Sequence, residues 1–256
     1  TLLLLRHLET KGVRVTYLPV DAHGRLDLVE LGRVLAPDTA LVTLLWANNE
    51  TGVLFPIEAA ADIVKSGGAL FHTDAVQAAG KINIDLKQGP ADLLSLSGHK
   101  LHAPKGVGAL FVRKGLKWPA LLFGHQERAR RGGTENVPGI VGLGVAAALA
   151  LEDMDSDMAR MRTLRDRLEQ GVVERIPFAS INGAAAGRVA NTSNICFGDM
   201  EAEIILDRLD RAGICAALGA ACTAGGAEPS HVLTAMGRAP RAARAAIRFS
   251  LSRYTT

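Results

Sequence analysis

The sequence predicts an α/β protein: a mostly parallel mixed sheet flanked by helices, followed by a smaller C-terminal α+β domain. Up to about residue 150, short apolar runs typical of strands alternate with helical patterns. Beyond that point the pattern changes to one long amphipathic helix and several short strands. We therefore expect a large domain over residues 1–155 and a small domain over residues 156–256.

The elements of the large domain follow from periodicity and from helix-terminating residues. Residues 1–12 have a helical pattern that ends at Gly12, and the alternating, β-branched stretch 13–20 predicts a strand. The continuous apolar run 39–47 is typical of a strand covered on both faces. The remaining elements expected here are helices over 26–36 and 57–68, a buried strand that begins at 69, and short strands within 91–100 and 106–114.

The small domain is expected to begin with the amphipathic helix 158–176. Before it, the apolar stretch 140–151 is too short and too rich in alanine for a membrane span, so we expect a packed helix. Short strands are expected at 179–183, 192–197 and 213–218, with a helix over 201–213.

The composition excludes several classes of protein. With 48% hydrophobic and 21% charged residues, the 256-residue chain is typical of a soluble globular protein. A net charge of +3 does not indicate binding to nucleic acid, and no apolar run indicates a membrane. Three cysteines without metal-type spacing fit a reducing compartment, so we expect a cytoplasmic protein without a metal site. Because the chain opens inside an apolar pattern without Met, we expect a further N-terminal portion.

Polar clusters follow three of the expected strands. They are NNETG (48–52), HTDAVQ (72–77) and SGHK (97–100). Because the carboxyl ends of parallel strands meet at one edge of a sheet, we expect these clusters to converge.

Several roles are open for the residues of these clusters. Lys100 suits a surface cation, a phosphate ligand or a Schiff-base nucleophile, and Ser97 and His99 add donors suited to a phosphate. Asp74 could hold a pyridine nitrogen protonated, so that the ring works as an electron sink. It could equally cap a helix that starts at residue 75, with Gln77 in the position of a capping-box partner.

Six motifs extend the pattern over essentially the whole chain: NNETG, HTDAVQ, SLSGHKLHAPKGVGAL, RRGGTENVPGIVGLG, ACTAGGAEPSHVL and IRFSLSRYTT. In order and spacing they resemble the cysteine desulfurases, pyridoxal-phosphate enzymes of the class V aminotransferase group with the type I aminotransferase fold. The ERARRGGTEN and AEPSHVL forms are most similar to the nitrogen-fixation type and its housekeeping relatives. The resemblance implies the cofactor pyridoxal 5'-phosphate, the substrate L-cysteine, and sulfur supply to an iron–sulfur scaffold protein.

The resemblance also implies roles for the residues of the large domain. Lys100 matches the lysine that binds the cofactor covalently and moves the Cα proton of the substrate. Asp74 matches the aspartate paired with the pyridinium nitrogen, and Gln77 the glutamine at the ring hydroxyl. Ser97 and His99 match ligands of the phosphate.

Three further matches concern the substrate and a second subunit. Asn49 matches an asparagine near the ring hydroxyl and the substrate carboxylate. Arg248 resembles an arginine that clamps this carboxylate, a task that suits a bidentate guanidinium. Thr134 resembles a threonine that reaches the phosphate of the neighbouring subunit's cofactor, which implies a homodimer.

The three cysteines receive different interpretations. Cys222 lies among glycines and alanines, which favours an exposed, reactive thiol, whereas for Cys196 and Cys215 we expect small buried side chains. In the family that the chain resembles, the thiol at the position of Cys222 attacks the substrate sulfur and becomes a persulfide, and L-alanine leaves. The serine that usually precedes this cysteine is Ala221 here.

Two family features lie upstream of the segment that LRHLETKGVRVTYL resembles: a histidine stacked on the pyridine ring and a Gly/Thr phosphate loop. His7 lies within the first expected helix and does not match that histidine. A protein without these features is expected to bind the cofactor weakly.

Alternative functions remain. They are a selenocysteine lyase or another class V enzyme, and a catalytically inactive scaffold or binding protein that keeps the fold. A nicotinamide-binding protein is disfavoured, because Gly139, Gly142 and Gly144 do not follow a strand in the G-x-G-x-x-G pattern.

Overall fold

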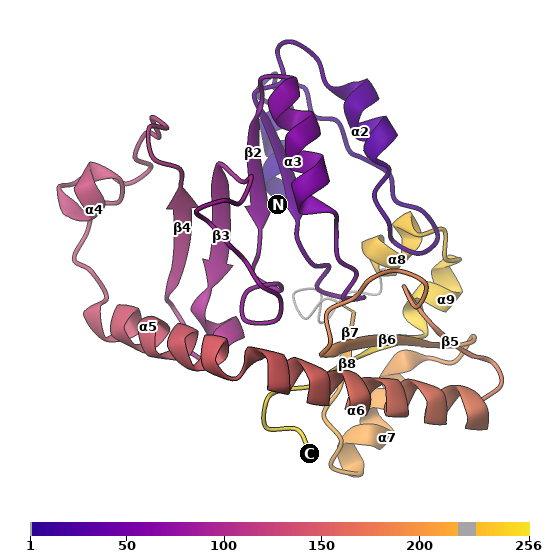
Figure 1. The fold of residues 1–256 in the computed structure, drawn as a ribbon. Coiled ribbons are helices and arrows are strands. Elements are labelled where there is room, and N and C mark those ends of the chain that lie inside the picture. The colour runs from indigo at the N-terminus through magenta and orange to yellow at the C-terminus, as the bar shows by residue number, and fades with distance from the viewer. Residues whose placement is uncertain (1, 220–228) are drawn as a thin grey trace.

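The computed structural model describes residues 2–219 and 229–256, which form two four-stranded sheets connected by long helices (Figure 1). The first sheet has the strand order β1-β2-β3-β4. Its strands are β1 (Leu41–Leu45), β2 (Leu70–Asp74), β3 (Leu93–Ser97) and β4 (Gly108–Val112). The first three are parallel and β4 is antiparallel to β3, which confirms the predicted mostly parallel mixed sheet.

Helices pack against one face of this sheet. The helical elements are α1 (Leu2–Glu9), α2 (Leu28–Val34), α3 (Ile57–Ser66), the 3-10 helix η1 (Gly98–Leu101) and the short α4 (Gln126–Ala129). α3 packs on β2, and α2 packs on α3. The core between them contains Phe71 and Leu94 from the strands and Ile57 and Val64 from α3.

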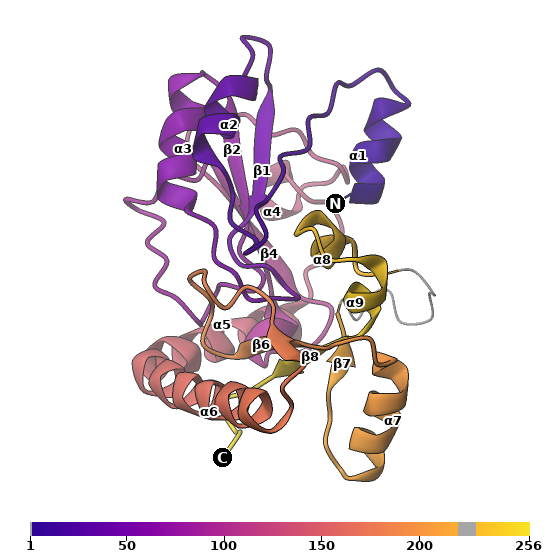
Figure 2. The same cartoon turned by 90° about the vertical axis from the view of Figure 1, so that its right-hand side faces the viewer.

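The second sheet is antiparallel and has the order β5-β6-β8-β7. Its strands are β5 (Ala179–Ile181), β6 (Thr192–Phe197), β7 (Ala217–Leu218) and β8 (Ala246–Ser250), and its helices are α6 (Met154–Arg175), α7 (Ala202–Arg211), α8 (His231–Ala235) and α9 (Pro240–Arg244). Apolar side chains of the C-terminal part of α6 and of α7 pack against Ile195 and Ile247, while those of α8 and α9 pack against Cys196 and Ala246. The sheet is therefore covered on both faces, as Figure 2 shows.

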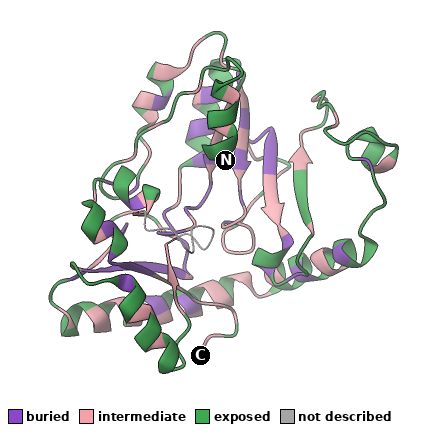
Figure 3. Ribbon diagram, turned by 180° about the vertical axis from the view of Figure 1, so that it is seen from behind, coloured by how far each residue is buried: buried purple, intermediate pink, exposed green. Residues whose placement is uncertain are grey.

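The helix α5 (Val137–Glu152) is apolar but largely exposed (Figure 3). Only a strip that includes Ala146 and Ala150 contacts Leu101 and Ala103, so the predicted packing of 140–151 holds along this strip alone. No single helix among the described residues is long and apolar enough to cross a membrane. The pair α5 and α6, bent by 71°, meets the criteria of length and composition only when taken together.

One predicted strand is wrong. Residues 13–20 form no strand and take part only in an isolated bridge between Val20 and Leu26, because a strand needs a hydrogen-bonded neighbour and this stretch is mostly exposed. The alternative helix after Asp74 is not formed: residues 76–81 form turns, and Gly80 within them has a φ of +69°. The proposed domain boundary after residue 155 falls in the first turn of α6.

A turn after β1 connects the two sheets. The Asn48 side-chain oxygen accepts hydrogen bonds from the Glu50 and Thr51 amides at 2.9 and 3.0 Å, which closes the turn. Gly52 has a φ of +76°, and a Cβ atom there would lie 3.0 Å from Thr192, so glycine alone fits. The turn therefore reaches the second sheet through backbone atoms.

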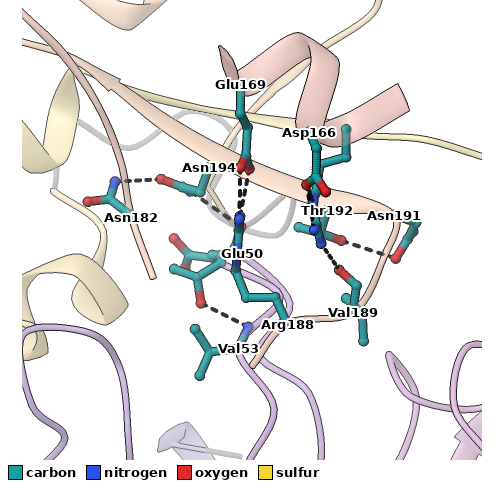
Figure 4. A network of polar contacts seen from close by, with 12 residues as sticks. Glu50, Val53, Asp166, Glu169, Asn182, Arg188, Val189, Asn191, Thr192 and Asn194 are labelled. Atoms are coloured by element: carbon teal, nitrogen blue, oxygen red, sulfur yellow. Dashed lines mark hydrogen bonds and ion pairs between the residues drawn. The ribbon is translucent and has the colours of Figure 1, made fainter. Parts of the chain in front are cut away.

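Hydrogen bonds from the second sheet and its neighbouring segments hold this turn (Figure 4). The Asn194 side-chain amide donates to the Glu50 carbonyl at 3.3 Å, and the Val189 backbone amide donates to the Gly52 carbonyl at 2.9 Å. Beside them, Arg188 and Glu169 form a bidentate ion pair at 2.6 and 2.8 Å with both side chains almost wholly buried. The pair fastens the segment around Arg188 to α6.

A row of polar side chains crosses the face of the first sheet that α3 does not cover. His72 Nδ1 lies 2.6 Å from the Thr43 hydroxyl, and its Nε2 lies 3.0 Å from the Ser95 hydroxyl. Burial lowers the pKa of His72, and the charge of Asp74 opposes this shift less strongly. The neutral imidazole is therefore the form that the fold favours.

Replacing Arg188 by Met should destabilise the protein strongly, because Glu169 would keep a buried charge without its partner. We expect a loss of about 3–5 kcal/mol in the free energy of unfolding, measured by urea denaturation. The exposed pair of Arg33 and Glu30 provides the control, and Arg33→Met should cost less than about 1 kcal/mol. Equal losses in the two variants would show that the buried pair does not hold the segment.

Protonation of His72 should lower the free energy of unfolding in mild acid. Because its folded-state pKa lies below the ordinary value of 6.5, the unfolded chain binds the proton more readily once the pH drops through 6.5. His72→Gln should reduce the loss of unfolding free energy between pH 7.5 and pH 5.5. The exposed His23 is the control, and an unchanged pH dependence in His72→Gln would contradict the assignment.

Candidate functional site

A cavity of about 250 Å³ lies between the carboxyl ends of β1–β3 and the second sheet. Five of the residues predicted from the sequence line it: Asn49, Gln77, His99, Lys100 and Arg248. The expected convergence of the strand ends is therefore present, and Arg248 joins it from β8. Asp74 and Ser97 end their strands close by but are not among the residues that line this cavity.

The segment after β3 is shaped by close packing around Gly98. A Cβ atom at Gly98 would lie 2.8 Å from the Val107 side chain and 3.1 Å from its carbonyl oxygen, so only glycine allows η1 to form there. His102 ends η1 in the left-handed conformation, and its amide donates to the Gly98 carbonyl. The turn leaves His99 and Lys100 exposed at the cavity.

Ser97 and His99 form a pair at the start of this turn. The Ser97 hydroxyl lies 2.7 Å from His99 Nδ1. The two side chains therefore present a hydroxyl and an imidazole side by side, two groups that can bind a phosphate.

Asp74 caps a turn. Its carboxylate accepts a hydrogen bond from the Val76 amide at 2.9 Å. Asp74 therefore caps a turn rather than the alternative helix. This one contact leaves lone pairs on the carboxylate for a further partner.

Arg248 and Asn49 meet although 199 residues separate them. Arg248 donates from Nη1 to the Asn49 carbonyl at 3.0 Å, and both residues line the cavity. This contact brings a guanidinium and a side-chain amide, two groups suited to a carboxylate, into the same site.

Besides Asp74 and Ser97, one further predicted residue does not line the cavity, and another is not described. Thr134 is exposed, lies just before α5 and is not among the lining residues. Cys222 lies outside the described residues, which include β7 before it and Ser230 after it. Ser230 donates its hydroxyl to the Glu50 carboxylate at 2.5 Å, so the chain resumes beside the turn that carries Asn49.

The other two cysteines differ from each other. Cys196 is buried as predicted, its thiol contacts the Ala242 carbonyl oxygen at 3.3 Å, and burial raises its pKa. The prediction for Cys215 is wrong: it is exposed, because it lies in the open connection between α7 and β7.

Sequence reasoning missed Lys81. Its side chain lines the cavity, and its amine nitrogen is buried with no hydrogen-bond partner in the described part of the chain. Burial and, to a smaller extent, the charge of Lys100 together lower its pKa to about 8. The only signal in the sequence is its position after the turn at Gly80 and before the apolar Ile82. Residues 2–219 and 229–256 contain no cluster of His, Cys, Asp or Glu that could hold a metal ion.

Known proteins are similar to this chain over 97–100% of its length. A cysteine desulfurase of Gluconacetobacter diazotrophicus is 56% identical over 97% of the chain, and the match covers 62% of that relative. A solved structure of a NifS-like protein matches with a TM-score of 0.90 and 38% identity, covering 98% of this chain and 66% of the other. A structure of SspA in complex with cysteine matches with a TM-score of 0.83 and 33% identity, covering 100% and 71%.

The chain thus spans less than two thirds of the length of the first of these relatives. The family model for class V aminotransferases, in contrast, matches all of residues 1–256. Together with the mixed sheet and the residues gathered at its strand ends, this match shows that the chain belongs to the aminotransferase class-V family.

Proposed function

We propose that the protein is a pyridoxal-phosphate-dependent cysteine desulfurase, which converts L-cysteine to L-alanine and holds the sulfur as a persulfide on Cys222. The observation that carries the proposal is that Lys100, Gln77, His99, Asn49 and Arg248 line the same cavity. The relatives that are 51–56% identical to the chain and are named cysteine desulfurase support the choice of reaction.

The residues present fit pyridoxal 5'-phosphate. The pair of Ser97 and His99 offers donors for a phosphate, and the exposed Lys100 offers an amine for a covalent bond to an aldehyde. Asp74 offers a carboxylate for a pyridinium nitrogen, and Gln77 offers an amide for the ring hydroxyl. When bound, the cofactor supplies an electron sink for the electron pair released at the substrate Cα.

The chain's own residues then have the following tasks. Arg248 and Asn49 bind and orient the substrate carboxylate. Lys100, once released from the cofactor, removes the Cα proton as a general base. The Cys222 thiolate attacks the substrate sulfur and the carbon–sulfur bond breaks, so that its electron pair stays on the carbon skeleton; this skeleton takes up one proton at Cβ, regains at Cα the proton that Lys100 removed, and leaves as alanine.

We also propose that the protein acts as a homodimer and passes its sulfur to an iron–sulfur scaffold protein in the cytoplasm. The exposed Thr134 lies at the start of α5, whose exposed apolar side chains include Val141, Val145 and Leu149. Exposed apolar surface of this kind favours association, and it lies where the second subunit would meet Thr134. The resemblance of ERARRGGTEN to the nitrogen-fixation type supports the choice of acceptor.

Lys100→Ala should abolish the covalent attachment of the cofactor. The whole protein with pyridoxal phosphate should absorb near ~400 nm, as expected for a lysine–cofactor bond, and the variant should not. Turnover of cysteine should fall by about 10²–10⁴-fold through loss of the base. Lys105→Ala, at an exposed lysine of the same loop, should keep both the band and the activity. A band that survives Lys100→Ala, or no band in the parent, would favour a non-catalytic protein that keeps the fold.

Cys222→Ser should separate cofactor binding from sulfur transfer. We expect the absorption band to persist, because Cys222 does not hold the cofactor, while persulfide labelling and alanine formation disappear. Cys215→Ser replaces another thiol, exposed in the structure, and should leave both unchanged. Normal turnover in Cys222→Ser would contradict the persulfide step and favour a lyase of the selenocysteine type.

A further inference from the structure

Lys81 is held in the cavity by the turn that follows β2. The turn includes Gly80, where a Cβ atom would lie 2.5 Å from the Leu101 side chain and 3.3 Å from Ala150. Close packing against these two residues brings the main chain near η1 and α5, so that the next side chain lines the cavity. The position of Lys81 is thus fixed by packing and is not that of a mobile surface lysine.

The amine of Lys81 is buried without a partner. Its nitrogen has no hydrogen bond to any described residue, although an ammonium group has three donors. Burial of an unpaired ammonium is costly, so such a group either loses its proton or pairs with an anion. With a pKa lowered to about 8, the Lys81 amine is mostly protonated at neutral pH, so the ammonium group still requires an anion.

The cavity has more cationic than anionic groups. Its titratable and charged lining residues are Lys81, His99, Lys100, His102, Asp157, Arg248 and Arg253. Asp157, the acidic residue among them, already pairs with Arg160 at 2.8 Å and with Arg253 at 3.3 Å. The site therefore attracts an anion that the described residues do not supply.

We propose that Lys81 is a carboxylate-binding residue of this cavity, separate from the contact between Arg248 and Asn49. A carboxylate fits better than a phosphate, because Ser97 and His99 already offer a phosphate site and the cavity of about 250 Å³ suits a small ligand. The carboxylate is that of a small organic acid or amino acid from solution. The proposal does not depend on the desulfurase activity.

The test measures the reactivity of Lys81 in the whole protein with its cofactor bound. Trace acetylation at pH 6–10 with isotope-labelled acetic anhydride, followed by mass spectrometry, reports each lysine separately. The exposed Lys87 is the internal reference. Propionate is the probe, and propionamide, which has nearly the same shape without the charge, is its control.

Propionate should protect Lys81 and propionamide should not. We expect the acetylation rate at pH 8 to fall at least ~5-fold, because pairing with a carboxylate stabilises the unreactive ammonium form. Propionate should also raise the melting temperature of the parent and of Lys87→Met, but not of Lys81→Met. Because labelling uses the parent protein, the result stands even if Lys81→Met folds poorly.

Two outcomes would overturn the proposal: acetylation with a midpoint near pH 8 that propionate does not change, or resistance of Lys81 to acetylation in the absence of propionate. Neither readout requires turnover, so loss of the proposed activity and failure of this inference are distinguished.

Discussion

The turn formed by residues 48–52 is the contact on which the site depends. It offers the carbonyl oxygens of Asn49, Glu50 and Gly52, and each accepts a hydrogen bond from the second half of the chain. Backbone carbonyls are fixed in position once the turn is closed, so these bonds set the distance between the two sheets. The cavity lies between those sheets, and its shape therefore follows from this turn more than from any lining side chain.

Packing determines which groups in the site carry uncompensated charge. Gly80 and Gly98 bring backbone and neighbouring side chains closer than any other residue would allow, and they place Lys81 and Lys100 around one cavity. The positive charge of Lys100 lowers the pKa of Lys81 in this site. The site is thus arranged for anionic ligands, which is consistent with both the phosphate and the carboxylates proposed above.

The sequence predicts well which residues lie at the strand ends, but it predicts poorly which residues of the second sheet contact them. Asn49, His99 and Lys100 follow apolar runs that can only be buried strands, so their place at the sheet edge is fixed by topology. The contact between Arg248 and Asn49 has no local signal, because it depends on how the second sheet docks. The strand predicted over 13–20 is wrong for a related reason. Alternation of apolar and polar residues indicates a strand only where a neighbouring strand is available, and this stretch has only the bridge at Val20.

α5 connects the outer surface of the protein to the site. Its buried strip touches Leu101 in η1, the element that carries His99 and Lys100, and Ala150 on the same strip lines the cavity. The exposed apolar side chains of α5, among them Val145, lie on the same rigid helix. Contact on that surface would fix the helix and, through Leu101, the position of η1. Subunit association and the geometry of the lysine that we propose to be catalytic would then be coupled through one layer of packed side chains, without a moving loop.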